Sequence, residues 1–524
     1  MNLSCTFIRK NLLKFVETLS PEIMAFNQRN QRTFPGFLFL LSVMLILAVR
    51  MNGQVVHDES RYVPDPDPLV QEKLEQWQDL KFGLLMHWGT YSQWGIVESW
   101  SICPEEYGWC ERKMGSDPEN YNTYVKEYEA LKNTFNPVKF DPDKWAEAAA
   151  QAGMKYVIFT TKHHDGFCMF DTKYTDYKIT DKACPFSANP KADITKEIFK
   201  AFRAKGFWTG AYFSKPDWHC PWYWSPAYPP RDRNVNYEPE ANPELWQKYV
   251  DFTHNQIMEL VSNYGAVDIL WLDGGWVSKK SKEEIKEWYD NALENSAYGY
   301  LKRRVINQDI NMDALVEKVR EKQPGILVVD RAVHGKNQNY LTPENRVPEK
   351  ALEYPWESCI ISGGGWSYTP DARYMSGREG IQLLVDIVAK GGNLLLNIAP
   401  SPDGEWQQGA YDLLQEFAGW MKVNAEAIYE TRAMAPYKEG NICMTQKEDG
   451  TVYFYYMAGE EETELPEEIT VTSYRPVKGA TVSLLGNDTP LKWKKAGKTG
   501  FRIIIPKKIR QNPPAKYVWV FKVK

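Results

Sequence analysis

The stretch ILWLDGGW, residues 269 to 276, decides the fold. Its apolar part has the length of a buried strand and runs directly into a carboxylate, Asp273, before the chain turns on two glycines. A helical pattern, ELWQKYVDFTHNQIMELVSNYG (244 to 265), leads into the strand. A carboxylate in this position can project into a pocket, although an aspartate here can also cap a following helix. The stretch therefore predicts a helix–strand unit with a polar side chain at the carboxyl end of the strand.

The same unit recurs from about residue 65 to residue 425. Further apolar strands with polar ends are expected at KFGLLMHWG (81 to 89), MKYVIFTTKHHDGF (154 to 167), FWTGAYFS (207 to 214), PGILVVDR (324 to 331) and GGNLLLNIAP (391 to 400). Alternation of strands and helices predicts an α/β fold with a parallel sheet, and a length of about 360 residues suits a (β/α)8-like barrel. In that architecture the carboxyl ends of the strands form the active site.

The pattern changes after about residue 435, where strands such as EEITVTSY (467 to 474) and GFRIIIP (500 to 506) follow one another with hardly any helix between them. This predicts a small all-β sandwich. The expected domains are a (β/α)8-like catalytic domain at 54–430 and a β-sandwich domain at 431–524.

The first fifty residues contain an unbroken apolar run, FLFLLSVMLILAV (37 to 49), which Arg29 and Arg32 precede. The run has the length of a signal-peptide core and is short for a membrane span. We therefore expect residues 1–53 to be a signal peptide, with Met24 as a possible true start, and the protein to be periplasmic or secreted. The alternative is an N-terminal membrane anchor.

Composition and net charge argue against some classes of binding partner. Without residues 1–53 the chain keeps 57 basic and 66 acidic residues, a net charge of −9, which argues against a nucleic-acid or anionic-membrane partner. Aromatic residues make up 14%, with 20 Trp and 30 Tyr, as suits either a sugar-binding protein or a large aromatic core. The cysteines form no CxxC pair, so metal binding by them is not expected, while Cys103 and Cys110 are close enough in sequence to bridge.

Polar groups gather at the predicted strand ends, and their shared location favours function over core packing. They are His87, His163, His164, Tyr212, Asp273 and Arg331. Asp273 has the chemistry of a nucleophile, a general base or a metal ligand. Two carboxylates, Glu344 and Glu357, follow Arg331, and paired carboxylates on either side of a glycosidic bond are what glycosidases use.

A metal site at His163, His164 and Asp273 is the alternative. Adjacent histidines point to opposite faces of an extended chain, and no HxH or HExxH spacing is present. We therefore expect no metal and no cofactor. The loop DWHCPWYW (217 to 224) is either a substrate platform or a packed lid.

Seven segments in order resemble the signature segments of glycoside hydrolase family 29, the α-L-fucosidases. They are KFGLLMHWG, VESWS, KHHDGF, YFS, LWLDGG, PWESC with GGGWSY, and GGNLLLNIAPSPDG. The resemblance covers about residues 65 to 425, and the β-domain that follows is similar too. The TPE segment at Glu344 looks like the arrangement in bacterial members, so a bacterial protein is expected.

The resemblance implies a retaining enzyme that releases terminal α-L-fucose through a covalent glycosyl-enzyme on Asp273. Glu344 is the favoured acid/base and Glu357 its rival. The implied fucose-binding residues are His87, Glu98, His163, His164, Tyr212, Trp271, Arg331 and Trp366, with Trp100 as a looser match. The implied partner is an oligosaccharide or glycan.

Three other functions stay open. An exo-α-L-galactosidase acting on algal-type galactan would use the same mechanism, and Asp217 and His219 of the 217–224 loop could contact its extra hydroxyl. A non-catalytic carbohydrate-binding protein belongs to a different class, against which the presence of Asp273 and both candidate acids speaks. A metal-dependent barrel hydrolase is the third.

Overall fold

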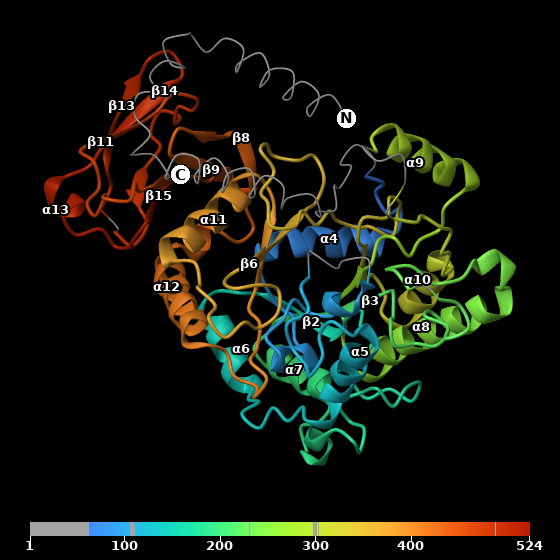
Figure 1. The fold of residues 1–524 in the computed structure, drawn as a ribbon. Coiled ribbons are helices and arrows are strands. Elements are labelled where there is room, and N and C mark those ends of the chain that lie inside the picture. The colour runs from blue at the N-terminus through green and yellow to red at the C-terminus, as the bar shows by residue number, and fades with distance from the viewer. Residues whose placement is uncertain (1–61, 105–109, 230, 297–300, 302, 488) are drawn as a thin grey trace, which may run out of the picture. The chain divides into compact units, whose positions relative to one another are not determined.

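The computed structural model describes residues 62–524, apart from 105–109, 230, 297–300, 302 and 488 (Figure 1). The expected signal segment 37–49 and the candidate start Met24 lie outside the described residues. Every element below belongs to one compact unit, His57–Lys524. Among the described residues, no helix has both the length and the apolar character needed to cross a membrane.

The first sheet consists of seven parallel strands, in the order β5-β4-β3-β2-β1-β7-β6. The strands are β1 (Phe82–Met86), β2 (Tyr156–Lys162), β3 (Trp208–Ser214), β4 (Ile269–Asp273), β5 (Leu327–Asp330), β6 (Glu357–Ile361) and β7 (Asn393–Asn397). Nearly all their residues are buried, as a parallel sheet covered by helices requires. The expected α/β class is therefore present, but the described strands number seven where the barrel prediction requires eight.

An irregular segment, residues 337–345, joins the two edge strands. Asn339 N donates to Val328 O of β5 over 2.9 Å, and Glu357 N of β6 donates to Leu341 O over 2.8 Å. The segment is not a regular strand because Pro343 has no N–H to donate. Asn345 has a positive φ of 48°, which turns the chain out of the extended conformation.

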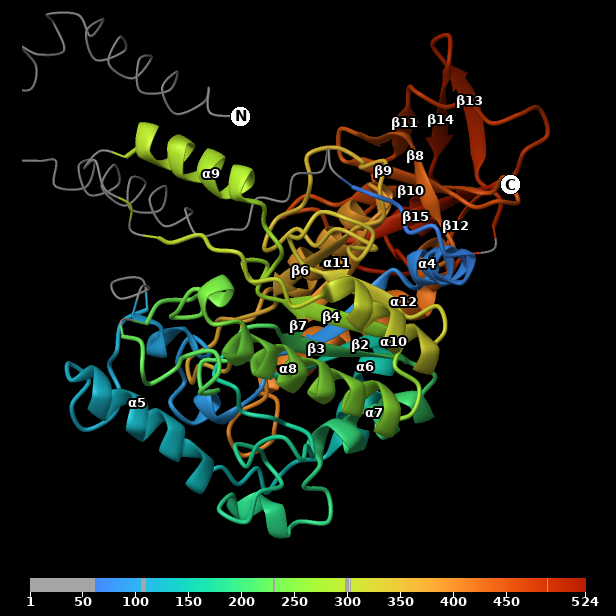
Figure 2. The same ribbon diagram turned by 90° about the vertical axis from the view of Figure 1, so that its right-hand side faces the viewer.

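Helices surround the sheet (Figure 1, Figure 2). They are α4 (Pro68–Leu80), α6 (Pro142–Gln151), α7 (Ile194–Ala204), α8 (Pro243–Asn263), α10 (Met312–Lys322), α11 (Gly377–Ala389) and α12 (Gln408–Asn424). Polar caps begin several of them: Asp141 accepts from Lys144 N at α6, and Ser376 and Glu379 form a capping box at α11. Apart from α4, their apolar faces pack with the strands in one large core. Val70 and Trp77 of α4 pack in a separate cluster with other strand residues, among them Tyr212 and Trp271.

Long connections after β1, β3 and β4 build a second, aromatic core. It includes Tyr128 from the first connection, Trp218 and Trp224 from the second, and Val277 from the third. These connections also contain α5 (Tyr121–Ala130) and α9 (Lys282–Glu294). Because all three leave the carboxyl ends of their strands, this second core adjoins the end of the sheet where Asp273 lies.

Two antiparallel sheets form the C-terminal part. The first has the order β12-β15-β10-β9-β8 and the second β11-β14-β13. The elements are β8 (Arg432–Glu439), β9 (Ile442–Gln446), β10 (Val452–Met457), β11 (Glu468–Val471), β12 (Val482–Leu484), β13 (Lys492–Ala496), β14 (Gly500–Ile504), α13 (Lys507–Arg510) and β15 (Val518–Val523). Phe454 of the first sheet and Phe501 of the second pack in one apolar cluster, as in a sandwich. Helix gives way to strand between α12 and β8, while the boundary at 430 stays a prediction.

Candidate active site

Five of the predicted polar residues lie at the carboxyl ends of neighbouring strands. Asp273 ends β4, His163 and His164 follow β2, His87 follows β1, and Arg331 follows β5. Tyr212 lies on β3, opposite Trp271 of β4. Trp271 and Asp273 are two residues apart, so both side chains point to the same side of the sheet.

Two groups bind the Asp273 carboxylate, and a third lies close to it. Tyr212 donates its hydroxyl to Oδ2 over 2.8 Å, Arg331 donates to Oδ1 over 3.2 Å, and His164 Nε2 lies 3.6 Å from Oδ2. Burial alone would raise the pKa of Asp273, but Arg331 and His164 hold it well below its usual range. The glycine after it is required, since Gly274 has a φ of +88° and a Cβ there would lie 2.3 Å from Pro216 Cδ.

Arg331 connects two carboxylates. One guanidinium nitrogen binds Asp273, and the other makes a short contact with Glu344 Oε2. Glu344 also accepts from the indole N–H of Trp366 over 3.2 Å, and 22% of its side chain is exposed. Nε of Arg331 donates to Thr342 over 3.2 Å. Asp273 and Glu344 are therefore held on one guanidinium, and Glu344 remains accessible.

Three buried histidines line the same region. His87 Nδ1 lies 3.1 Å from Asn397 Oδ1, and His163 Nδ1 is hydrogen-bonded to Ser99. Burial lowers the pKa of His87 and of His164 to about 4 and that of His163 well below its usual value. All three are therefore neutral near pH 7, and both ring nitrogens of His164 lack a hydrogen-bond partner within the part of the chain that the structure describes. A neutral imidazole offers one donor and one acceptor, as a sugar hydroxyl requires.

Glu98 and Trp100 complete the region. Glu98 is buried and accepts from Ser367 N over 2.9 Å, and burial raises its pKa to about 8. The Trp100 ring lies 5.0 Å from that of His164. His164 Nε2 in turn lies 3.6 Å from Asp273 Oδ2.

Glu357 is not part of this cluster. It is the first residue of β6, is fully buried, and lies at the amino end of the sheet. Tyr156 donates to its Oε2 over 2.6 Å and Trp271 to its Oε1 over 3.3 Å. The expectation that Glu357 is an acid/base at the pocket is at odds with this position, because the pocket residues follow the opposite strand ends.

The suggested substrate contacts of the 217–224 loop are also wrong in this structure. Asp217 is buried and pairs with Lys162 over 3.0 Å. His219 pairs with Glu129 over 3.0 Å and stacks on Tyr177. Both side chains contribute to the packing of the loop, which is therefore a well-packed segment of the fold.

Four residues of the site were not predicted. Thr342, Asn397, Ser99 and Ser367 each hold a predicted residue by a hydrogen bond. Asn397 is the last residue of β7, so the strand-end argument that found Asp273 applies to it as well.

A metal site is geometrically feasible here, because ligand atoms of His163, His164 and Asp273 lie within 4.8 Å of one another. The same carboxylate binds Arg331 over 3.2 Å. A guanidinium so close repels a cation, so the local charge does not favour a metal.

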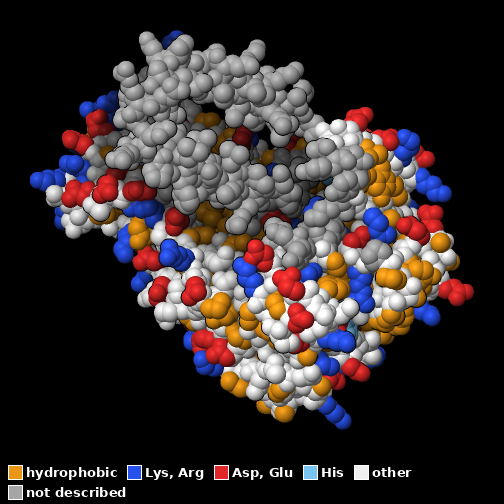
Figure 3. Space-filling model, viewed as in Figure 1, with side chains coloured by type: hydrophobic (Ala, Val, Ile, Leu, Met, Phe, Trp, Pro, Cys, Tyr) orange, Lys and Arg blue, Asp and Glu red, His pale blue; other side chains and the backbone are white. Residues whose placement is uncertain are grey.

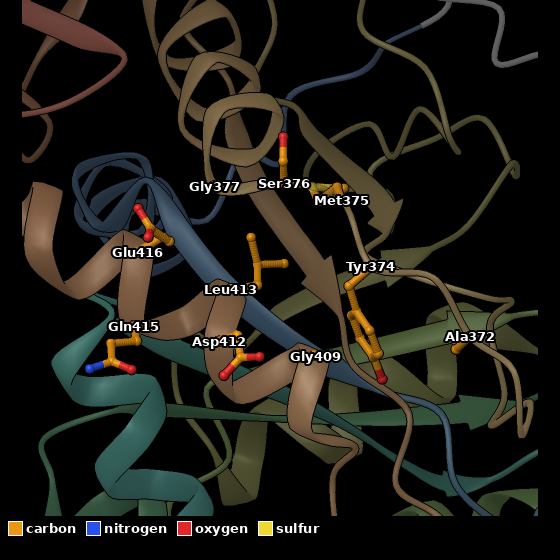
Figure 4. Close-up of a pocket in the computed structure, with 10 residues that line it drawn as sticks. All are labelled: Ala372, Tyr374, Met375, Ser376, Gly377, Gly409, Asp412, Leu413, Gln415 and Glu416. Atoms are coloured by element: carbon orange, nitrogen blue, oxygen red, sulfur yellow. The ribbon is translucent and has the colours of Figure 1, made fainter. Parts of the chain in front are cut away.

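A cavity of about 510 Å³ lies elsewhere, between the start of α11 and helix α12 (Figure 4). Tyr374, Asp412 and Glu416 line it, and its lining includes none of the strand-end residues described above. We place the site at the strand ends, where the hydrogen-bonded charges converge, rather than in this cavity.

Comparisons with known proteins show which family the chain resembles over most of its length. The sequence model of the family described as alpha-L-fucosidase matches residues 49–426. An alpha-L-fucosidase of Branchiostoma floridae is 28% identical over 485 residues, which are 89% of this chain and 96% of that protein. The structure of alpha-L-fucosidase isoenzyme 1 from Paenibacillus thiaminolyticus is 29% identical, has a TM-score of 0.65, and covers 87% of this chain and 99% of its own.

The Thermotoga maritima alpha-fucosidase, solved in complex with a mechanism-based inhibitor, is 27% identical with a TM-score of 0.65 and covers 88% of this chain and 100% of its own. A bacterial origin is not confirmed by these similarities, because the similar curated proteins come mostly from eukaryotes.

Proposed function

Because the chain belongs to the α-L-fucosidase family, whose sequence model matches most of it, we propose that it is a retaining exo-glycosidase that releases terminal α-L-fucose from glycans. It is a glycoside hydrolase, since the proteins similar to it over most of their length are fucosidases. The roles of single residues below belong to the proposal.

The observation that carries the mechanism is the shared guanidinium of Arg331, which binds Asp273 and Glu344 at once. A retaining glycosidase needs two carboxyl groups roughly 5 Å apart, one to attack and one to transfer protons. Asp273 is the nucleophile, since its low pKa keeps it ionised. Its oxygen bonds to the anomeric carbon while Glu344 gives a proton to the leaving oxygen. Glu344 then takes a proton from water, which displaces Asp273.

The pocket residues bind the sugar. His87, His163, His164 and the neutral carboxyl group of Glu98 supply donors and acceptors for its hydroxyls. Tyr212 and Arg331 hold the nucleophile, and the ring of Trp366 gives apolar surface for the sugar's C–H groups. Trp271, which is 1% exposed, packs against Tyr212 and Arg331 instead.

Release of L-galactose is the less supported alternative. The similar proteins are named fucosidases, and Asp217 and His219 make contacts within the protein instead.

On the face in Figure 3, basic and acidic side chains are interspersed, unlike the basic patch of a nucleic-acid-binding protein.

We also propose that residues 1–53 direct export, which N-terminal sequencing of secreted protein tests.

The test is hydrolysis of aryl α-L-fucoside and aryl α-L-galactoside by the purified protein. We expect fucoside turnover with α-L-fucose as the first product, unchanged by a chelator. Asp273→Ala should lower kcat at least about a thousandfold, because it removes the attacking group. Asp268→Asn, just before the other end of β4, is the matched control and should keep kcat.

Other outcomes have clear meanings. Preference for the galactoside would overturn the substrate but keep the mechanism. Loss of activity with the chelator would favour the metal enzyme. Binding without turnover of either glycoside would favour the carbohydrate-binding protein.

A further inference from the structure

Glu357 is a buried carboxyl group for which the proposed mechanism has no use. It begins β6 opposite Asn393, the first residue of β7, and 0% of it is exposed. Asp273 ends β4, at the other end of the sheet. Each strand residue rises about 3.3 Å, so Glu357 lies in the interior beneath the pocket rather than at its surface.

Its carboxyl group fixes two aromatic side chains. Tyr156 of β2 donates its hydroxyl to Oε2 over 2.6 Å, and Trp271 of β4 donates its indole N–H to Oε1 over 3.3 Å. Burial raises the pKa of Glu357 to about 8. The side chain is therefore neutral at pH 7, and a glutamine can replace it without a change of charge.

Trp271 in turn contacts both groups that hold Asp273. Its ring stacks on Tyr212 with 5.2 Å between centroids and 23° between planes, and the Arg331 guanidinium lies 5.0 Å from its centroid. Tyr212 and Arg331 bind the two oxygens of Asp273. A continuous set of contacts thus leads from Glu357 through Trp271 to the nucleophile.

We propose that Glu357 is a positioning residue, which orients Trp271 by accepting its indole N–H so that Tyr212 and Arg331 hold Asp273 in place. Removal of the acceptor frees the Trp271 ring to turn, and the two groups that stack on it lose their fixed support. A small misplacement of reacting groups lowers the rate strongly, whereas it changes binding of the sugar less.

The inference rests on the proposed fucosidase activity, so wild-type turnover is measured first. Steady-state kinetics on an aryl α-L-fucoside then compare Glu357→Gln, Glu357→Leu, Trp271→Phe and the double variant Glu357→Leu/Trp271→Phe. Glu259→Leu, which removes a buried carboxyl group of α8 away from the site, is the control. Thermal midpoints of all variants report folding.

We expect Glu357→Gln to keep kcat within about threefold of wild type, since its amide oxygen can still accept from Trp271. Glu357→Leu should lower kcat at least about tenfold with a smaller change in KM. The double variant should be no slower than Trp271→Phe alone, because a residue that acts through another is not additive with it. The control should shift only the thermal midpoint.

Several results would overturn the inference. A Leu variant as active as wild type, or additive losses in the double variant, would show that Glu357 does not act through Trp271. A Gln variant that is slow, and that azide rescues, would make Glu357 the acid/base. If the Leu variant does not fold, Glu357→Asp, which withdraws the carboxyl group by one methylene, should be slower than Gln. A wild-type chain inactive on fucosides would instead overturn the proposed function and this inference with it.

Discussion

Glu98 is a carboxyl group in surroundings that disfavour its charge. It is buried, and Glu344 and Asp273 lie close enough to add to the rise that burial causes, so its pKa is about 8. The hydrogen bond from Ser367 N opposes the rise without cancelling it. Near pH 7 the group is a neutral acid that can donate as well as accept.

This predicts a pH-dependent stability difference between wild type and Glu98→Gln. The pKa of Glu98 in the folded protein is about 8, above the ordinary 4.5. Protonation of Glu98 therefore stabilises the folded protein fully below pH 4.5, and this contribution is lost as pH rises through 8. Glutamine cannot ionise, so the variant should gain stability relative to wild type between pH 5 and 8, on the order of a few kcal/mol. Thermal unfolding at several pH values measures this, with exposed Glu294→Gln as control. A constant difference would contradict the raised pKa.

Single residues were predicted where the strand direction is readable from the sequence. Asp273, Arg331 and His87 each follow an apolar run, and all three lie at carboxyl ends. Glu357 precedes its run, SCII, instead of following it, and so lies at the amino end. The short run ESCII is not apolar enough to predict a strand from the sequence, so the position of Glu357 at the start of β6 could not be predicted.

The 217–224 loop is an element held by one buried ion pair. Lys162 Nζ lies 3.0 Å from Asp217 Oδ2 and 3.0 Å from Gln256 Oε1, and Asp217 Oδ1 accepts from Cys220 N over 2.9 Å. Trp218 N donates to His164 O over 2.7 Å. The pair thus ties the loop to the strand that precedes the two pocket histidines.

Asp217→Ala is therefore expected to destabilise the protein by about 3–5 kcal/mol, because it leaves a buried lysine without its partner. Urea unfolding measures the loss. His219→Ala in the same loop removes only a half-exposed pair and should change stability by about 1 kcal/mol or less. It should also leave the ratio of fucoside to galactoside turnover unchanged. A changed ratio would restore His219 as a substrate contact.

At the level of elements, periodicity predicted the parallel strands but not how the sheet is completed. Segment 337–345 makes only isolated bridges to its neighbours, and its sequence, NQNYLTPEN, has no apolar run. Long-range contacts with β5 and β6 hold it, and local propensity does not report such contacts. The same segment carries Glu344, so the part of the sheet that sequence could not describe contains the favoured acid/base.

The C-terminal antiparallel sheets and the helices around the parallel sheet share one core. Cys443, Tyr455 and Val520 belong to the same apolar cluster as Phe417 and Trp420 of α12. Polar contacts reinforce this interface, since Arg378 of α11 donates to the carbonyls of Ala458 and Gly459 over 2.8 Å. The sequence located the change from helix to strand because periodicity changes there. It could not show the shared core, since the apolar residues of α12 look alike whether they face the sheet or a second domain.

The shared core predicts that the described part of the chain unfolds as one unit. Trp420 is buried and donates its indole N–H to Val518 O over 2.9 Å, so Trp420→Ala removes a large side chain and leaves a buried carbonyl unpaired. We expect a loss of about 3–5 kcal/mol. Near-UV signals, activity and calorimetry should all report one transition, shifted to lower temperature by the same amount. Trp493→Ala in β13, away from the α12 interface, is the control and should shift the transition less. Two separate transitions in wild type, or a Trp420→Ala shift confined to one of them, would show that the C-terminal sheets and the parallel-sheet part fold independently.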